Sequence, residues 1–395
     1  MRYFLLLILL TAGVTAHAQK RITGSVVDAE TKAPVPNASV FINNSSIGTT
    51  AKEDGKFELL LPAGKFELII SSVGYQTRSI LMHSNEADAF ITIALEVKSP
   101  ELETVIVEPF EKDGWRKWGR WFIENFLGTS SFSKSCKLEN HEVLKFRHST
   151  KNNTMTVFAD APLVIENSAL GYRITYQLES FSYDFKNQFL LYTGYPFFEM
   201  LKGNERRQRR WMKAREEVFY GSMLHFMRAL YRNRVVEEGY SVQRLKKIRN
   251  QEKDRVRMVY KTSMQANENG VLISTINSDS SAYYDNVMSQ DDYFSVVEKA
   301  FLTGDSIAYA VDSTTAGMDF ENYLLITYKN KNATTEFLKF YPSMTSEITL
   351  INGKPLEILA NGSYYNPVDL MSTGYWAWSE KVGSMLPFDY YPKKP

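Results

Sequence analysis

Short runs of alternating apolar and polar residues dominate the chain between residues 20 and 100. Ile22–Asp28 alternates in the manner of a half-buried strand. Pro34 prevents regular ladder pairing, and a Gly at position 55 places a turn directly before the alternating run Phe57–Leu61. Because these strands are short and no helical period interrupts them, the region is predicted to form a β-sandwich.

Helical and strand patterns follow one another in the middle of the chain. Trp115–Phe126 repeats apolar residues at i, i+3, i+4 and i+7, which predicts an amphipathic helix that packs its aromatics between two domains. A place in a membrane interface is the alternative for this helix. Residues 142–194 predict antiparallel strands with a bulge near Ser180. Residues 205–232 predict a helix that is interrupted at Gly221.

The last third of the chain predicts further strands and one helix. The strands are Tyr240–Ile248, Arg255–Lys261, Tyr323–Tyr328 and Phe337–Tyr341, and the helix is Tyr293–Phe301. Asn352 and Gly353 lie between two apolar runs, which predicts a hairpin of Ile348–Ile351 with Leu356–Leu359.

The N-terminus has the pattern of an export signal. Arg2 is followed by the apolar run FLLLILL, and the sequence AHA at 16–18 supplies the small residues that signal peptidase reads. Cleavage is predicted before Gln19, and the loss of Arg2 takes the formal net charge from +1 to 0. No later segment reaches the ~18 apolar residues of a transmembrane helix, so none is expected after cleavage. A near-neutral chain does not attract nucleic acid by charge, and Cys136, the single cysteine, has no partner for an intramolecular disulfide.

An ordered set of short motifs makes a family resemblance specific. G-x-V-x-D is followed by P-V-P-N-A-x-V, G-T, D-G-x-F, P-A-G and S-x-V-G-Y between Ile22 and about Leu95. This run resembles the carboxypeptidase-regulatory-like domain, whose fold is a seven-stranded transthyretin-like β-sandwich. In that family the domain is non-catalytic; it accompanies zinc carboxypeptidases and stands at the N-terminus of TonB-dependent transporters of the Gram-negative outer membrane. Leu102–Val107 resembles the strand that follows it there, but the remaining chain is too short for the transporters' large barrel.

The resemblance implies a mainly β fold with α+β character, in which the sandwich precedes a domain of antiparallel sheet and helices. The predicted divisions are a signal peptide at 1–18, the sandwich at 19–98, a linker strand at 99–112 and an α+β domain at 113–395. The last region is similar to exported proteins that carry the same sandwich and have no assigned activity. This similarity therefore implies that the protein is exported to the cell envelope, where it is periplasmic or associated with the outer membrane. It implies no mechanism.

Residues with catalytic or metal-binding chemistry occur without a supporting motif. His83–Glu86 matches the H-x-x-E of zinc carboxypeptidases, but it lies in the sandwich rather than in a catalytic domain. His141 and His148 are too few for a typical metal site, Cys136 lacks the surroundings of a nucleophile, and the acidic pair at 291–292 is typical of a helix start rather than of a glycosidase. No catalytic, metal-binding or cofactor-binding residue is predicted, and no cofactor.

Two groups of side chains are candidates for contact surfaces. Four aromatics near the C-terminus could meet a partner, although aromatics at a chain end more often pack into a core: Tyr364, Tyr365, Trp376 and Trp378. Four arginines could bind phosphate groups, with a solvated helix face as the alternative: Arg206, Arg207, Arg209 and Arg210.

The predicted function is that of a non-enzymatic cell-envelope protein with a binding or scaffolding role, whose partner is an envelope protein or a glycan. An envelope hydrolase acting on peptide or glycan is the alternative. Peripheral association with a membrane through Trp115–Phe126 and the arginine-rich helix is a third interpretation.

Overall fold

The computed structural model describes residues 20–86, 90–98, 108–266, 272–274, 278–331, 335–339, 344–365 and 367–393. The predicted export signal and the predicted strand at 102–107 lie outside these residues. The chain divides into two compact units, each considered by itself: unit 1 is Met1–Phe219 with Lys381–Pro395, and unit 2 is Tyr220–Glu380. Among the described residues, every helix falls short of the length and apolar character that crossing a membrane requires.

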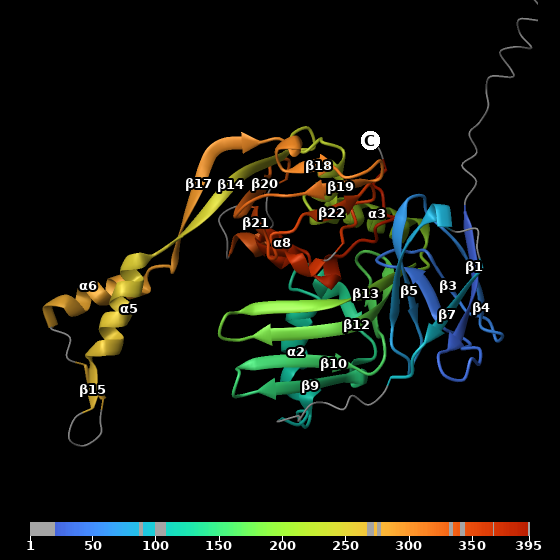
Figure 1. Cartoon of the computed structure of the whole chain (residues 1–395), viewed down its shortest axis with the longest axis horizontal. Helices are drawn as coiled ribbons and strands as arrows, with labels where there is room; N and C mark the ends of the chain where they lie inside the picture. The colour runs from blue at the N-terminus through green and yellow to red at the C-terminus, as the bar shows by residue number, and fades with distance from the viewer. Residues whose placement is uncertain are drawn as a thin grey trace, which may run out of the picture. The chain divides into compact units, whose positions relative to one another are not determined.

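Two sheets form the N-terminal sandwich of unit 1 (Figure 1). One sheet has the strand order β4-β1-β7 and the other β3-β2-β5-β6. The bounds are β1 Arg21–Asp28, β2 Ser39–Ile42, β3 Gly48–Thr50, β4 Lys56–Leu60, β5 Lys65–Ser71, β6 Arg78–His83 and β7 Ile91–Leu95. Strand β1 pairs antiparallel with β4 and parallel with β7, and the pairings in the second sheet are antiparallel. These seven strands confirm the predicted sandwich.

The alternation along β1 explains the sandwich core. Ile22 and Val26 are fully buried and join Leu68 of the other sheet in one hydrophobic cluster. Gly24 lies between them, and a Cβ at this position would approach Ile91 O to 2.4 Å. Only glycine therefore allows β7 to pair so closely with β1.

A six-stranded antiparallel sheet follows in unit 1. Its order is β8-β11-β12-β10-β9, with β13 also paired to β12. The bounds are β8 Cys136–Leu138, β9 Leu144–Ser149, β10 Thr154–Ala159, β11 Leu163–Asn167, β12 Tyr172–Asp184 and β13 Phe189–Met200. The predicted bulge is present as a register shift between Leu178 and Ser180. At the β12–β13 turn, Asp184 accepts hydrogen bonds from the backbone N–H groups of Lys186 and Asn187 at 2.8 and 3.0 Å.

Helix α2 (Gly114–Phe126) packs its aromatic face on this sheet. Phe122 and Phe126 are fully buried, and the Phe126 ring meets the ring of Tyr176 edge-on at 5.0 Å. The helix ends before Gly128, which takes a φ of 95° as a terminating glycine does. The predicted amphipathic helix is confirmed, and its buried aromatics pack on the sheet of unit 1.

Helix α3 (Glu205–Phe219) begins where Asn204 Oδ1 accepts a hydrogen bond from Arg207 N at 3.0 Å. Its buried Arg215 donates from Nε to Leu170 O at 2.7 Å and so ties the helix to the sheet. The chain returns to unit 1 after residue 380, where Asn167 Nδ2 donates to Gly383 O at 2.8 Å.

Unit 2 contains a five-stranded antiparallel sheet and a three-stranded sheet. Their orders are β17-β14-β20-β21-β23 and β18-β19-β22. The strands are β14 Tyr240–Arg249, β15 Met264–Ala266, β16 Leu272–Ser274, β17 Tyr293–Leu302, β18 Ala308–Ala310, β19 Thr315–Met318, β20 Tyr323–Tyr328, β21 Thr345–Leu350, β22 Leu356–Leu359 and β23 Leu370–Gly374. The helices are α4 Met223–Tyr231, α5 Gln251–Ser263, α6 Ser278–Ser289, α7 Thr335–Leu338 and α8 Tyr375–Ser379.

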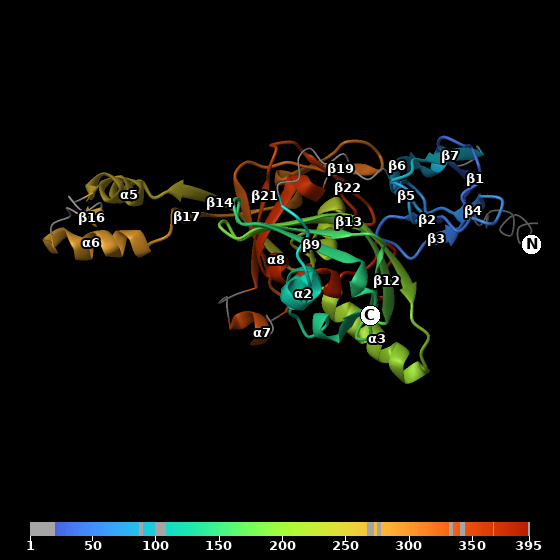
Figure 2. The same cartoon turned by 90° about the horizontal axis from the view of Figure 1, so that it is seen from below.

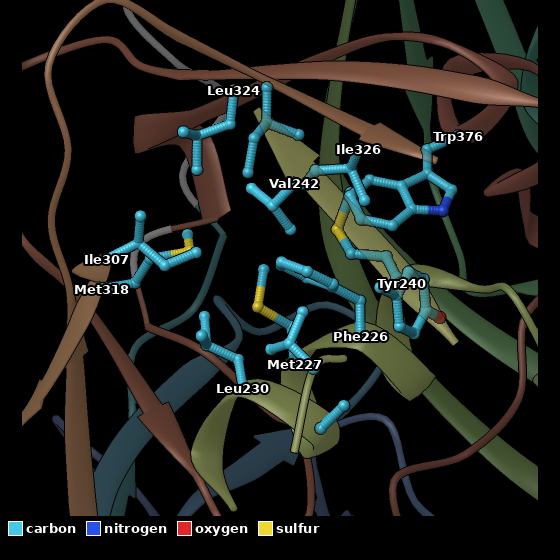
Figure 3. Packing of buried hydrophobic residues seen from close by; sticks show 14 of the residues in the cluster. Phe226, Met227, Leu230, Tyr240, Val242, Ile307, Met318, Leu324, Ile326 and Trp376 are labelled. Atoms are coloured by element: carbon cyan, nitrogen blue, oxygen red, sulfur yellow. The ribbon is translucent and has the colours of Figure 1, made fainter. Parts of the chain in front are cut away.

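Helix α4 packs between these sheets and supplies much of the core of unit 2. Phe226 and Met227 are fully buried and lie toward Val242 and Ile326 of the large sheet (Figure 3). The helix is apolar on most of its surface, as expected of a helix surrounded by other elements. The predicted interruption of the 205–232 helix is confirmed, since Ser222 Oγ accepts from His225 N at 3.1 Å and starts α4 anew.

Two elements of unit 2 differ from the prediction. Arg255–Lys261 was expected as a strand and lies in helix α5, where ion pairs between residues three apart join Arg255 to Glu252 at 2.6 Å. Tyr293–Phe301 was expected as a helix and forms β17, which pairs with β14. Both segments combine apolar and charged residues at spacings that fit either period, so pairing with neighbours decides the outcome.

The predicted hairpin at 348–359 is also wrong. Gly353 does turn the chain, with a φ of 59°. Strand β21 nevertheless pairs with β20 and β23, while β22 pairs with β19. The strand expected at Phe337–Tyr341 is wrong where it is described, because Phe337 and Leu338 lie in the short helix α7.

Candidate functional sites

A two-stranded ribbon leaves the large sheet of unit 2. Strand β14 pairs with β20 only as far as Leu245, whereas its pairing with β17 continues to Arg249 opposite Tyr293. Figures 1 and 2 show this ribbon running out to the helix pair α5 and α6. We call residues 246–297 the arm.

The arm exposes large apolar side chains on both faces of its ribbon. Phe294 and Val296 point to one face of β17, and Tyr293 and Val297 point to the other, because side chains alternate along a strand. Together with three further side chains they are between 40% and 72% exposed; the full set is Ile248, Met258, Tyr283, Tyr293, Phe294, Val296 and Val297. Apolar surface concentrated in this way marks interaction sites in soluble proteins.

Several charged side chains near the helices of the arm pair with one another. Asp292 lies 2.8 Å from Lys253 Nζ and 2.5 Å from Arg257, and these hydrogen bonds lower the pKa of Asp292 to about 2. The Arg255 guanidinium and the Tyr283 hydroxyl likewise lower the pKa of Glu252 to about 2. Asp292 therefore joins β17 to α5 and does not start a helix, which corrects the predicted role of the acidic pair at 291–292.

The predicted aromatic contact group lies in and around the core of unit 2. Trp376 is 2% exposed, and Tyr364 and Trp378 pack against the same cluster as partly buried residues. The fourth member, Tyr365, is also only partly exposed. A contact surface at this end of the chain, which stays a prediction, would be made by Tyr364, Tyr365 and Trp378 rather than by the buried Trp376.

Trp376 belongs to a group of side chains that holds the turn before α4. Its Nε1 donates to Gly221 O at 2.9 Å. The hydroxyl of Tyr240 donates to Ser222 O at 3.0 Å, and Glu380 Oε1 accepts from Met223 N at 3.1 Å. Buried backbone groups that the helix cannot satisfy thus find side-chain partners.

His225 completes this group and is neutral at pH 7. Its Nδ1 accepts from Gly221 N at 3.3 Å, which leaves the proton on Nε2 to be donated to Glu238 at 3.2 Å. Desolvation lowers the pKa of His225, against the opposing effect of Glu238. Burial also raises the pKa of Glu380 to about 7. His225 and Glu380 each accept a hydrogen bond from a backbone N–H group, which gives both side chains a structural role.

The four candidate arginines lie together on the exposed first half of α3. Arg206, Arg207, Arg209 and Arg210 are all exposed, and Arg209 pairs with Glu205 at 3.3 Å. Phosphate binding there stays a prediction, alongside the solvated helix face.

The remaining chemical candidates have structural partners. His141 stacks on Trp115 with ring centroids 4.6 Å apart, and His148 contacts Trp118. Burial raises the pKa of the Cys136 thiol to about 12, so it is not a thiolate at neutral pH. Among the described residues, no group of three or more His, Cys, Asp or Glu is placed to hold a metal ion.

A cleft of about 450 Å³ opens in unit 2 beside the end of α4. Its lining residues are Leu230, Tyr231, Asn233, Gly304, Asp305, Ala308, Tyr309, Ala310, Asp312, Ser313, Thr315 and Ala316. A short 3-10 helix at Gly304–Ser306 and the loop at 312–314 bring Asp305 and Asp312 to it. The sequence analysis did not predict this cleft. The clusters of turn residues on either side of Tyr309 are the sequence feature that marks it.

Comparison with known proteins identifies the first quarter of the chain. The family model of the CarboxypepD_reg-like domain matches residues 22–107. Residues 22–107 are a CarboxypepD_reg-like domain. This confirms the resemblance drawn from the motifs, and the two-sheet sandwich is the fold of that domain in this chain.

Two proteins of Formosa agariphila are similar to part of this chain. TonB-dependent receptor P3 is 28% identical over 104 residues, and TonB-dependent receptor P39 is 28% identical over 91 residues. These alignments cover 26% and 23% of this chain but only 10% and 8% of the receptors, so the chain spans about a tenth of the relatives' length. The similarity fits an envelope or exported protein.

A solved structure from Bacteroides fragilis, of a protein of unknown function, aligns with 85% of this chain and 92% of its own at 11% identity. A 9R-lipoxygenase from Cyanothece aligns with 54% of this chain and 49% of its own at 10% identity. The TM-scores are 0.16 and 0.17, so neither alignment bears on the fold.

Proposed function

We propose that this protein is a non-enzymatic binding or scaffolding component of the Gram-negative cell envelope, associated with an outer-membrane protein through the arm of unit 2. The observation that carries the proposal is the exposed apolar surface of the arm, where Asp292 is already paired with Lys253 and Arg257. The CarboxypepD_reg-like domain and the similarity to TonB-dependent receptors support an envelope location.

The ribbon offers a partner two kinds of contact. Strand β17 is the edge of its sheet, so its outer backbone groups are available to a further strand. Side chains such as Phe294 and Val296 supply the apolar contact that gives such pairing its affinity. An enzyme would instead require converging catalytic groups, whereas His225 and Glu380 bind backbone N–H groups of the turn before α4, and Glu238 binds His225.

Removal of the arm tests this proposal. Lys247 and Ser295 are directly opposed in the ladder, so residues 248–294 can be replaced by an Asn-Gly turn that closes the ribbon. Mild crosslinking in the native envelope, followed by identification of the captured proteins, is expected to recover an outer-membrane protein with the intact chain and not with the shortened one.

Point variants separate binding from folding. Phe294→Ser combined with Val296→Ser is expected to lose the same crosslink while leaving the unfolding midpoint within about 2 °C, because both side chains are already exposed. Val73→Ser, at an exposed site of the CarboxypepD_reg-like domain, is the matched control and should retain the crosslink. Capture of the same protein by the arm-deleted chain would refute the role of the arm.

A further inference from the structure

We propose that the cleft beside α4 is a binding site for a neutral saccharide, with Tyr309 as the stacking platform. The site is separate from the arm, so it adds a second binding activity to the proposed scaffold.

Tyr309 has the geometry of a platform. Its ring lies against Gly317 on the neighbouring strand β19, where a Cβ would approach Tyr309 Cζ to 2.7 Å. Glycine at 317 therefore leaves the space that the Tyr309 ring occupies. The side chain is still 50% exposed, so part of the ring borders the cleft. An aromatic ring supported from below in this way can pack against the apolar C–H face of a sugar ring.

Polar groups around the platform match sugar hydroxyls. The carboxylates of Asp305 and Asp312 accept hydrogen bonds, the Asn233 amide both donates and accepts, and Ser313 adds a hydroxyl. Asp312 is oriented by its loop, since its Oδ1 accepts from Thr314 N at 2.7 Å. A ligand with many hydroxyls and C–H faces can use these groups and the platform together.

The charge of the lining selects among ligand classes. The lining residues include two aspartates and no lysine or arginine, so phosphorylated or carboxylated ligands are disfavoured. The small side chains Ala308, Ala310 and Ala316 leave room beside the platform, as a ring-shaped ligand requires. The volume of about 450 Å³ lies within the range of small-molecule sites.

Calorimetric titration of the exported chain tests the assignment. The probes are maltohexaose, xylohexaose, mannohexaose and chitohexaose as neutral oligosaccharides, with spermidine as the cationic probe. At least one neutral oligosaccharide is expected to bind. Tyr309→Ala should weaken that binding about tenfold, and Tyr309→Phe should retain it within about threefold, because the ring and not the hydroxyl makes the contact.

Matched variants keep the result interpretable. Tyr283→Ala replaces an exposed tyrosine of the arm and should leave saccharide binding unchanged. Each variant should keep the unfolding midpoint of the intact chain, since Tyr309 is half exposed. Failure of all four oligosaccharides to bind at millimolar concentration would overturn the proposal. Unchanged affinity in Tyr309→Ala, or binding of spermidine alone, would also overturn it.

Discussion

At the scale of single residues, the turn that starts α4 depends on side chains from distant parts of unit 2. Trp376 Nε1 is the donor to Gly221 O, and no water can replace it in a site that is 2% exposed. Trp376→Phe should therefore leave a buried carbonyl without its donor and create a small void. The expected loss is about 2–4 kcal/mol in the free energy of unfolding, measured by denaturant titration.

A second tryptophan provides the control for this substitution. Among the described residues, Trp118 Nε1 has no hydrogen-bond partner, so Trp118→Phe removes volume without removing a hydrogen bond. We expect it to cost less than half as much as Trp376→Phe. Equal losses would show that packing alone, and not the contact with Gly221, explains the effect of Trp376.

Glu380 should make stability depend on pH in a defined direction. Burial raises the pKa of its folded-state carboxyl to about 7 from the ordinary value of 4.5, so folding favours the protonated form. Its contribution to stability is full below pH 4.5 and is lost as the pH rises through 7. Burial lowers the pKa of Lys381 to about 8 from 10.5. Its effect on the pH dependence of stability therefore falls between about pH 8 and pH 10.5, above the range where Glu380 acts.

Glu380→Gln isolates this effect because glutamine keeps an acceptor for Met223 N but cannot ionise. The variant should gain stability relative to the parent chain between pH 5 and pH 8, as judged from unfolding free energies at each pH. A difference between the two chains that stays constant over this range would contradict the raised pKa.

At the scale of elements, α2 shows how an amphipathic pattern becomes packing. Phe122 is fully buried and its ring lies 5.1 Å from that of Phe181 on β12. Phe122→Ala should destabilise unit 1 by about 3–5 kcal/mol, as truncations of buried aromatics do. Glu124→Ala, on the exposed side of α2, should change stability by less than about 0.5 kcal/mol. A mild effect of Phe122→Ala, with loss of binding to lipid vesicles, would instead favour the membrane interpretation of this helix.

Local signals were sufficient for several elements that pair with their neighbour in sequence. The β12–β13 hairpin and the bulge near Ser180 follow from alternation and turn residues alone. The CarboxypepD_reg-like domain could be predicted from the sequence for the same reason, because its motifs mark consecutive turns. The pairing of β22 with β19, about forty residues earlier in the chain, leaves no such local trace.

The candidate sites were harder to predict for a related reason. The arm depends on β14 and β17 pairing across some fifty residues, and β17 was read as a helix. The cleft arises where Tyr309 meets Gly317 across two short strands. The buried position of Trp376, in contrast, agrees with the ordinary tendency of terminal aromatics to pack inward.

At the scale of the whole molecule, unit 2 is a continuous segment whose two ends meet. Met223 N and Glu380 Oε1 are 3.1 Å apart, and Trp376 holds Gly221 close to the other end of the same segment. Its hydrophobic cluster is drawn from within Tyr220–Glu380. A segment with its own core and adjacent ends has the anatomy of a domain that folds alone.

We therefore expect residues 220–380, expressed alone, to unfold cooperatively with a midpoint within about 10 °C of the corresponding transition in the full chain. Trp376→Phe in this fragment should lower the unfolding midpoint, because the hydrogen bond from Trp376 to Gly221 lies entirely inside it. A fragment that shows no cooperative transition would mean that the core of unit 2 needs unit 1 to form. In that case the adjacent ends would reflect the path of the chain rather than an independent domain.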